Sequence, residues 1–284
     1  MSESFLNQST AQDFIIETQN LQRVYNIGKR SVHALRGVDL QILPNQFAAL
    51  KGRSGSGKTT LLKCMAGLSE PTHGRVLLDG REILALPRRL LARHLGMLQQ
   101  HTVYVFDSSV MQTVLTGRHP HLGYWEREGP ADLRKADAAL AAVDLEGFSD
   151  RSVTGLSGGE ARRLAFATLL VQEPELMLLD EPTASLDLSH QIRVMDLMEK
   201  LKTEKAVTVV MVSHDVNLAA MYGDQLLLLK AGEIVCMGPP GEVLNFKTLE
   251  VKDEILPPLV GLSDGEEKRK TFIGNYRKVS DRHI

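Results

Sequence analysis

The chain has 284 residues, which at roughly 150 residues per domain allows one large domain or two small ones. It carries 33 Lys and Arg against 35 Asp and Glu, and this net charge of −2 argues against a protein that coats nucleic acid with a broad basic surface. Hydrophobic residues make up 43%, and no apolar run approaches the roughly 20 residues of a membrane span, so global disorder and a transmembrane helix are both excluded.

Short apolar runs alternate with helical stretches along most of the chain, and this alternation predicts an α/β fold. The predicted strands cover 14–16, 38–42, 47–50, 76–78, 95–98, 176–179, 207–212, 225–229 and 234–237. The predicted helices begin at Gly57, Pro87, Ala131, Gly158, Ser189 and Asp215. A polar, acidic N-terminus predicts no signal peptide, and two cysteines outside any CxxC pattern predict reduced thiols, so a cytosolic protein is expected.

One stretch of the chain, about 87–172, reads as mostly helical, and we expect it to form a helical subdomain inserted into the sheet-bearing core. Residues 12–250 would then make up one domain. The segment 251–284 is rich in charged residues and predicts a C-terminal extension, solvated and partly disordered.

A phosphate-binding motif of the form G-x-x-x-x-G-K-[ST] lies between a predicted strand and a predicted helix. Its residues are Gly52, Arg53, Ser54, Gly55, Ser56, Gly57, Lys58 and Thr59. Glycines let successive backbone N–H groups turn toward one anion at the start of a helix. Lys58 can reach the β- and γ-phosphates, and the Thr59 hydroxyl can bind Mg²⁺, so the motif predicts a nucleoside triphosphate site.

Two acidic residues end the apolar strand predicted at 176–179. Asp180 would emerge at the carboxyl end of a buried strand, where open α/β sheets bind ligands, and could hold Mg²⁺ through water. Glu181 would be free to orient or deprotonate an attacking water. Two acids in this position are costly to desolvate without a cation or a chemical role, which favours a catalytic pair over an ordinary strand end.

A third motif, Leu156-Ser157-Gly158-Gly159-Glu160, lies between the phosphate motif and the paired acids. A serine and two glycines at a helix start form a second anion-binding concavity, because the missing side chains allow close approach to a phosphate. In this order and spacing the chain resembles the ATP-binding-cassette (ABC) ATPases, whose signature reads LSGGQ. Glu160 stands where that signature has Gln, and we expect activity to survive the difference.

The resemblance extends over roughly residues 12 to 250 and implies further roles. Gln100 resembles the Q-loop glutamine that senses Mg²⁺ and the membrane partner, and His214 resembles the switch histidine on the γ-phosphate. Asp187, in Ser185-Leu186-Asp187, resembles the D-loop aspartate. Tyr25 resembles the aromatic residue that stacks on adenine, although a buried strand tyrosine is an equally fair interpretation.

What the resemblance implies is a P-loop ABC cassette with a RecA-like core, an antiparallel β subdomain and an inserted helical subdomain. Hydrolysis would depend on Glu181, His214 and Gln100, and Mg²⁺ would be bound by Thr59, Gln100 and Asp180. The implied ATP contacts are Tyr25, the phosphate motif, Thr60, Asp180, Ser157, Gly158, Gly159 and Asp187. Two cassettes would pair head to tail around ATP, as a homodimer or with another ATPase subunit, and drive a membrane permease.

The stretch from Gln100 onward, with residues 116–123, 213–220 and 238–244, is similar to importer ATPases for iron–siderophore, haem, cobalamin and related metal chelates. Residues 32–38 look more like lipoprotein- or macrolide-type export ATPases. A soluble ABC ATPase without transport function, such as one in iron–sulfur assembly, is the third interpretation. The first implies permease subunits, a periplasmic or extracellular substrate-binding protein, no nucleic acid, and a peripheral position at the cytoplasmic face of the membrane.

Overall fold

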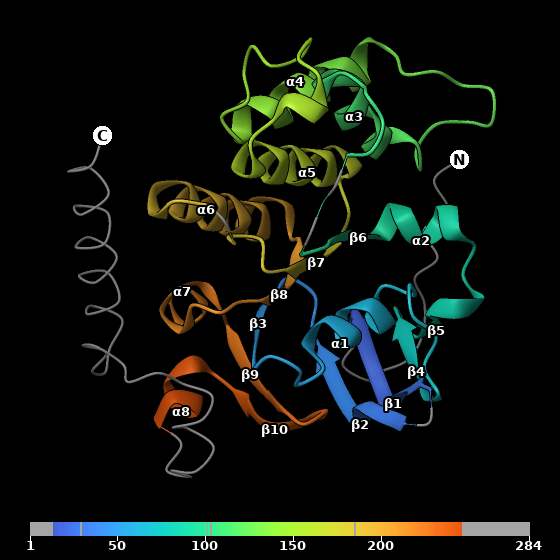
Figure 1. Cartoon of the computed structure of the whole chain (residues 1–284), viewed down its shortest axis with the longest axis vertical. Coiled ribbons are helices and arrows are strands. Elements are labelled where there is room, and N and C mark those ends of the chain that lie inside the picture. The colour runs from blue at the N-terminus through green and yellow to red at the C-terminus, as the bar shows by residue number, and fades with distance from the viewer. Residues whose placement is uncertain (1–13, 29, 101, 103, 185, 246–284) are drawn as a thin grey trace.

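The computed structural model describes residues 14–28, 30–100, 102, 104–184 and 186–245, and two sheets organise this part of the chain (Figure 1). The larger sheet has six strands in the order β10-β9-β3-β8-β7-β6. Its members are β3 (Phe47–Lys51), β6 (Leu95–Leu98), β7 (Leu176–Asp180), β8 (Thr208–Val212), β9 (Gln225–Lys230) and β10 (Glu233–Gly238). All pairs are parallel except β9 with β10. The carboxyl ends of β3, β7 and β8 therefore lie at the same edge of the sheet.

The second sheet is antiparallel, with the strand order β2-β1-β4-β5. It consists of β1 (Ile16–Ile27), β2 (Arg30–Ile42), β4 (His73–Leu78) and β5 (Arg81–Glu82). β1 and β2 are much longer than the predicted strands 14–16 and 38–42. For β2 the reason is that its first half is exposed and therefore lacks an apolar run. The two-residue β5 was not predicted.

Each helix expected from the sequence begins within one residue of the predicted position. The structure has α1 (Lys58–Met65), α2 (Arg88–His94), α4 (Pro130–Ala142), α5 (Gly158–Gln172), α6 (Leu188–Lys205) and α7 (Val216–Tyr222) at these places. The sequence analysis missed α3 (Val110–Leu115) and α8 (Pro240–Asn245), which have six residues each and are too short to show a helical period.

The helices cover opposite faces of the six-stranded sheet, as the alternation of side chains along β7 shows. Leu176 and Leu178 belong to a core with α1 and the antiparallel sheet. Met177 and Leu179 belong to a core with α3, α4, α5 and α6. Since successive strand side chains point to opposite faces, α1 and α5 lie on different sides of this sheet.

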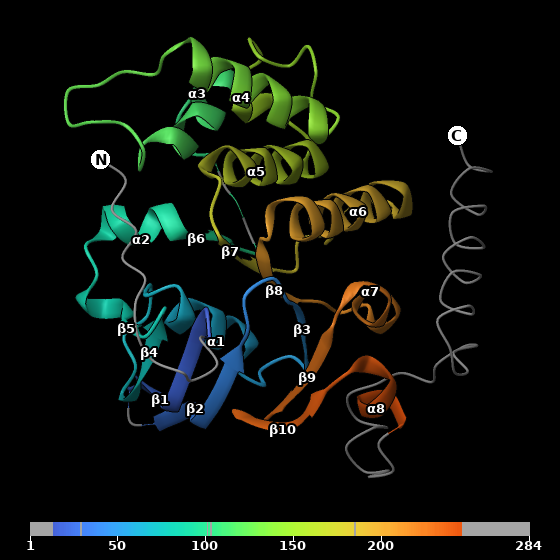
Figure 2. The same ribbon diagram turned by 180° about the vertical axis from the view of Figure 1, so that it is seen from behind.

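α3, α4 and α5 pack against one another and gather at one end of the molecule, away from β1, β2 and β10 (Figures 1 and 2). Within the stretch 87–172, β6 belongs to the six-stranded sheet, where it pairs with β7. The predicted α/β fold with an antiparallel sheet and an inserted helical part is confirmed. None of the helices in the described ranges has the length and apolar character that a membrane crossing requires. The predicted C-terminal extension, 251–284, lies outside the described residues.

Candidate functional site

The phosphate motif forms the tight connection between β3 and α1. Gly57 has φ +105° just before α1, and a Cβ there would lie 2.3 Å from the carbonyl oxygen of Ala34. A Cβ on Gly52 would lie equally close, 2.3 Å, to the carbonyl oxygen of Leu229. Both positions therefore require glycine, and the exposed apex of the loop, at 53–55, is left open to solvent.

Lys58 is buried and its side chain folds back over this loop. Its Nζ donates to the carbonyl oxygens of Gly52, at 2.8 Å, and Arg53, at 2.9 Å. Burial lowers the pKa of Lys58, while the carboxylates of Glu181 and Asp180 act in the opposite direction. The loop also holds Ser56 Oγ, a buried hydroxyl without a hydrogen-bond partner among the described residues. The motif therefore presents a cation and an unpaired hydroxyl that an anion could engage.

Asp180 ends β7 and is 1% exposed. Neither of its carboxylate oxygens has a hydrogen-bond partner within the described part of the chain. Burial raises the pKa of Asp180, and the charge of Glu181 raises it further, against the nearby Thr59 hydroxyl, Arg162 and Lys58. A buried carboxylate without a partner is unfavourable, and this one lies beside a threonine hydroxyl at the start of α1. Hard oxygen ligands of this kind fit Mg²⁺.

Glu181 has a left-handed backbone, with φ +54°, directly after β7. Its two carboxylate oxygens contact two other segments: Oε1 lies 2.5 Å from Nε2 of His214, and Oε2 accepts a hydrogen bond of 2.9 Å from Nε2 of Gln100. The structure thus brings together the three side chains for which the sequence implied a role in hydrolysis. They reach one point from the ends of β6, β7 and β8.

Ser157 caps the N-terminus of α5 in a reciprocal capping box. Its Oγ accepts from the backbone N–H of Glu160, at 3.3 Å, and the Glu160 carboxylate accepts from the backbone N–H of Ser157, at 2.7 Å. Hydrogen bonds from both the backbone and the hydroxyl of Ser157 lower the pKa of Glu160, so the two side chains hold each other in place at the start of α5. A Cβ on Gly158 would meet nothing within 4 Å, so the packing of the described residues does not explain a glycine there.

The sequence analysis missed Arg162, which is 6% exposed on α5. Its guanidinium donates to the carbonyl oxygens of Gln99, Gln100, Asp180, Glu181 and Pro182. One side chain therefore ties the helix that follows the signature to both loops that meet at Glu181. An arginine two residues after a capping box carries no local signal for this role.

Two other predicted site residues lie in a strand and at the start of a helix. Tyr25 is half-buried in β1, and the Arg23 guanidinium lies 4.7 Å from the centre of its ring. Asp187 caps α6 by accepting from the backbone N–H of His190, at 2.9 Å, and this bond is the main reason why its pKa falls to about 2. Ser185, of the predicted D-loop, lies outside the described residues.

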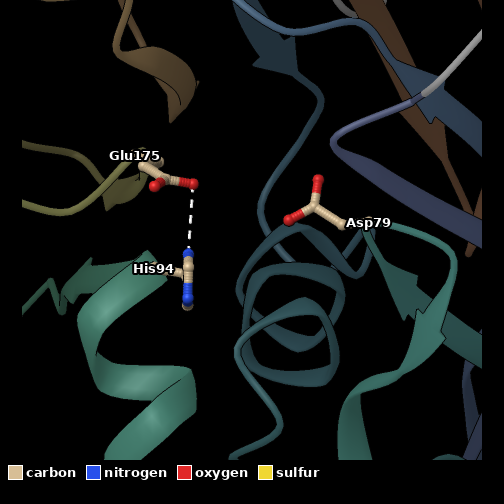
Figure 3. A group of neighbouring side chains, drawn as sticks. All are labelled: Asp79, His94 and Glu175. Carbon is tan, nitrogen blue, oxygen red and sulfur yellow. Dashed lines mark hydrogen bonds and ion pairs between the residues drawn. The ribbon is translucent and has the colours of Figure 1, made fainter. Parts of the chain in front are cut away.

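A separate group of ionisable side chains, Asp79, His94 and Glu175, lies near the start of β7 (Figure 3). His94 Nδ1 lies 3.1 Å from Glu175 Oε2, and the two acidic residues are exposed. Glu175 and Asp180 flank the same strand, about 17 Å apart at roughly 3.3 Å per residue. This surface group is therefore remote from the phosphate loop and takes no part in the site.

Comparison with known proteins shows to which family the chain belongs. The family model described as "ABC transporter" matches residues 35–184. The phosphonates import ATP-binding protein PhnC of Alcaligenes faecalis is 39% identical, covering 81% of this chain and 84% of that protein. The ferric enterobactin transport ATP-binding protein FepC of Escherichia coli is 37% identical, with 81% and 84% covered, and the hemin import ATP-binding protein HmuV of Rhizobium meliloti is 41% identical, with 76% and 84% covered.

A solved structure gives the same result for the fold. The ATP-binding cassette MJ0796, in a dimeric post-hydrolysis state bound to ADP and Pi, superposes with a TM-score of 0.71 and is 29% identical, covering 79% of this chain and 98% of that one. The matched family segment begins in β2, ends just after Glu181, and so includes the phosphate loop, the signature and the paired acids. The chain belongs to the ABC transporter family, as one of its ATP-hydrolysing cassettes.

Proposed function

We propose that this cassette is the ATPase subunit of a membrane importer, and that it hydrolyses ATP with Glu181 as the catalytic base. One observation carries the assignment of the site: the Glu181 carboxylate contacts both Gln100 and His214, next to the unpaired Asp180 and the phosphate loop. A carboxylate held by two polar side chains at the end of a parallel strand is well placed to orient a water.

The phosphate loop would bind the β- and γ-phosphates through its backbone N–H groups and the positive end of α1. Phosphate oxygens would compete with the carbonyl oxygens of Gly52 and Arg53 for Lys58 Nζ. Ser56 Oγ would gain a partner at the same time. Thr60, in the first turn of α1, and Tyr25 would line the nucleoside end, with the Tyr25 ring exchanging its Arg23 contact for adenine.

Asp180, Thr59 and Gln100 would hold Mg²⁺, which when bound supplies positive charge to the phosphates. Asp180 fits this role because both of its buried oxygens lack partners in the described structure. Gln100 can serve both Glu181 and the cation, since its amide offers donors and an acceptor. The neighbouring Glu181 keeps its two oxygens for His214 and Gln100, which favours different roles for the two acids.

A complete ATP site would need two chains. The phosphate loop precedes α1 and the signature precedes α5, and these helices cover opposite faces of the six-stranded sheet. The exposed Ser157 and the open surface at Gly158 suit a phosphate carried by a second chain. Head-to-tail pairing around a two-fold axis would make both sites equivalent, and Asp187 would lie near that interface.

The relatives supply the direction and the substrate class of the proposal. Those described above are named for the import of phosphonates and hemin and for the transport of ferric enterobactin. We propose import of an iron–siderophore, haem, cobalamin or similar chelate, through permease subunits fed by a substrate-binding protein, at the cytoplasmic face of the membrane. Phosphonate import is the second candidate, because the PhnC identity of 39% lies within the range of the other two.

Uptake by cells tests this proposal. A strain that lacks the gene is complemented with the wild-type chain or with Glu181→Gln, and uptake of ⁵⁵Fe–siderophore, haem and cobalamin is measured beside growth on a phosphonate as the phosphorus source. Uptake of one chelate that only the wild type restores supports the proposal. If only growth on phosphonate is restored, the substrate is a phosphonate and not a chelate. Normal uptake of every chelate and normal growth on phosphonate in the deletion strain would contradict an import role.

A further inference from the structure

A second buried lysine, Lys51, lies beneath the phosphate loop. It is the last residue of β3, a strand between β8 and β9 in the six-stranded sheet, and only 6% of its surface is exposed. Burying a lysine is unfavourable unless its charge and its donors are engaged. Burial lowers the pKa of Lys51, the charge of Lys58 adds to this, and the charges of Asp215 and Glu181 act against it. We therefore expect the buried ammonium group of Lys51 to have a specific hydrogen-bond partner.

That contact is the backbone of the histidine in the candidate site. Lys51 Nζ donates to the carbonyl oxygen of His214. The neighbouring groups of this turn already have partners. Ser213 Oγ accepts from the backbone N–H of Asp215, at 3.1 Å, and donates to its carbonyl oxygen, also at 3.1 Å. The Asp215 carboxylate caps α7. Lys51 therefore holds the remaining part of this turn, the peptide group of His214.

The side chain of His214 has little packing of its own. It is 60% exposed, and the contact that the structure gives it is the one of 2.5 Å between Nε2 and Glu181 Oε1. With so much of the ring in solvent, the position of the backbone decides where the imidazole lies. A shift of the 213–215 turn would carry the ring away from Glu181.

We propose that Lys51 is a positioning residue, which holds the His214 peptide so that the imidazole meets the Glu181 carboxylate. This inference rests on the proposed role of His214 in hydrolysis and adds a residue to it. Its chemistry is a single charge-assisted bond from Nζ to a backbone carbonyl, a class of hydrogen bond that is stronger than a neutral one.

Steady-state kinetics of Lys51→Met give the first test, with Lys200→Met as the matched control because Lys200 is exposed on α6. Methionine keeps most of the length of the side chain and removes the donor. We expect kcat to fall about tenfold to a hundredfold, as misplaced catalytic groups do, with KM for ATP unchanged. Lys51→Arg keeps a donor and should recover most of the rate. An unchanged kcat in a folded Lys51→Met protein would overturn the proposal.

A double variant separates positioning from direct contact with the nucleotide. If Lys51 acts through His214, adding Lys51→Met to His214→Ala should leave the already low rate unchanged, because coupled residues are not additive. A further drop, or a raised KM, would show that Lys51 acts on ATP itself and would overturn the proposal. Loss of rate in His214→Ala alone keeps the proposed function standing whatever Lys51 does.

The nucleotide-free protein offers a readout that does not depend on turnover. In spectra of protein with isotope-labelled histidine, the His214 ring signal of Lys51→Met should move to the position it takes in Glu181→Gln, where the carboxylate is gone. The signal in Lys200→Met should stay at the wild-type position. A wild-type His214 signal in Lys51→Met would contradict the inference. Lys51→Gln, too short to reach the carbonyl, replaces Lys51→Met if that variant does not fold.

Discussion

Nε2 of His214 lies 2.5 Å from Oε1 of Glu181, and this contact joins the ends of β8 and β7 at a residue with left-handed backbone. Gln100 completes the group from the end of β6. Three adjacent parallel strands therefore contribute one side chain each to a group centred on the Glu181 carboxylate. The predictions below test what that carboxylate, the phosphate loop and the signature do.

Glu181→Gln should keep ATP binding and reduce hydrolysis by about a hundredfold or more, because a general base contributes 10² to 10⁴ in rate. The amide keeps the shape of the side chain but cannot take a proton. Phosphate release and an ATP titration measure the two quantities separately. Wild-type turnover in this variant would contradict the assignment of Glu181.

Lys58→Ala should weaken ATP binding by at least about tenfold, since a hydrogen bond to a charged group contributes about 1.5–3 kcal/mol. The same variant also frees the carbonyl oxygens of Gly52 and Arg53, which Lys58 Nζ now engages. Isothermal titration with ATP measures the affinity. Lys200→Ala, on the exposed face of α6, is the control and should bind as the wild type does.

Asp180→Asn should raise the melting temperature of the nucleotide-free protein and abolish Mg²⁺-dependent hydrolysis. Burial raises the folded-state pKa of Asp180 above its unfolded value. The stability it contributes is therefore full below the unfolded pKa, near 3.9, and is lost as the pH rises through the raised pKa. Asparagine removes this loss at neutral pH. A melting temperature below the wild-type value at pH 7 would contradict the account of the buried, unpaired carboxylate.

Arg162→Met should lower the free energy of unfolding by about 3 kcal/mol or more, because each buried hydrogen-bonding group left without its partner costs about 1–3 kcal/mol. The variant strands backbone carbonyls at 99–100 and 180–182 that the guanidinium now satisfies. Denaturant unfolding measures the change. Arg134→Met, on an exposed position of α4, removes the same charge without a buried contact and should change stability little. Equal effects of the two substitutions would contradict the role of Arg162.

Much of the fold can be predicted from the sequence because buried parallel strands are continuous apolar runs. The runs at 47–50, 95–98 and 176–179 fall in strands of the six-stranded sheet. The exposed half of β2 carries no such pattern, so its length was underestimated. The short helices α3 and α8 were not predicted for a related reason, since six residues are too few to show a helical period.

The candidate site likewise contains residues that the sequence predicts and residues that it does not. Motif order pointed to Gln100, Glu181 and His214, which the structure places in contact. Arg162 and Lys51 could not be found, because each acts on backbone carbonyls that only the tertiary fold brings near it. A single arginine or lysine in the sequence is ordinarily a solvated surface residue.

The most direct test of the two-chain ATP site is the solution mass of Glu181→Gln, measured by light scattering with and without ATP and Mg²⁺. Gly158→Ala in the same background probes the interface, because an added Cβ there meets nothing in the described part of its own chain but would face a second chain. We expect ATP to convert Glu181→Gln from one chain to two, and the added Gly158→Ala to weaken that conversion without lowering the melting temperature. A Glu181→Gln protein that binds ATP by titration and keeps the mass of one chain would contradict the account.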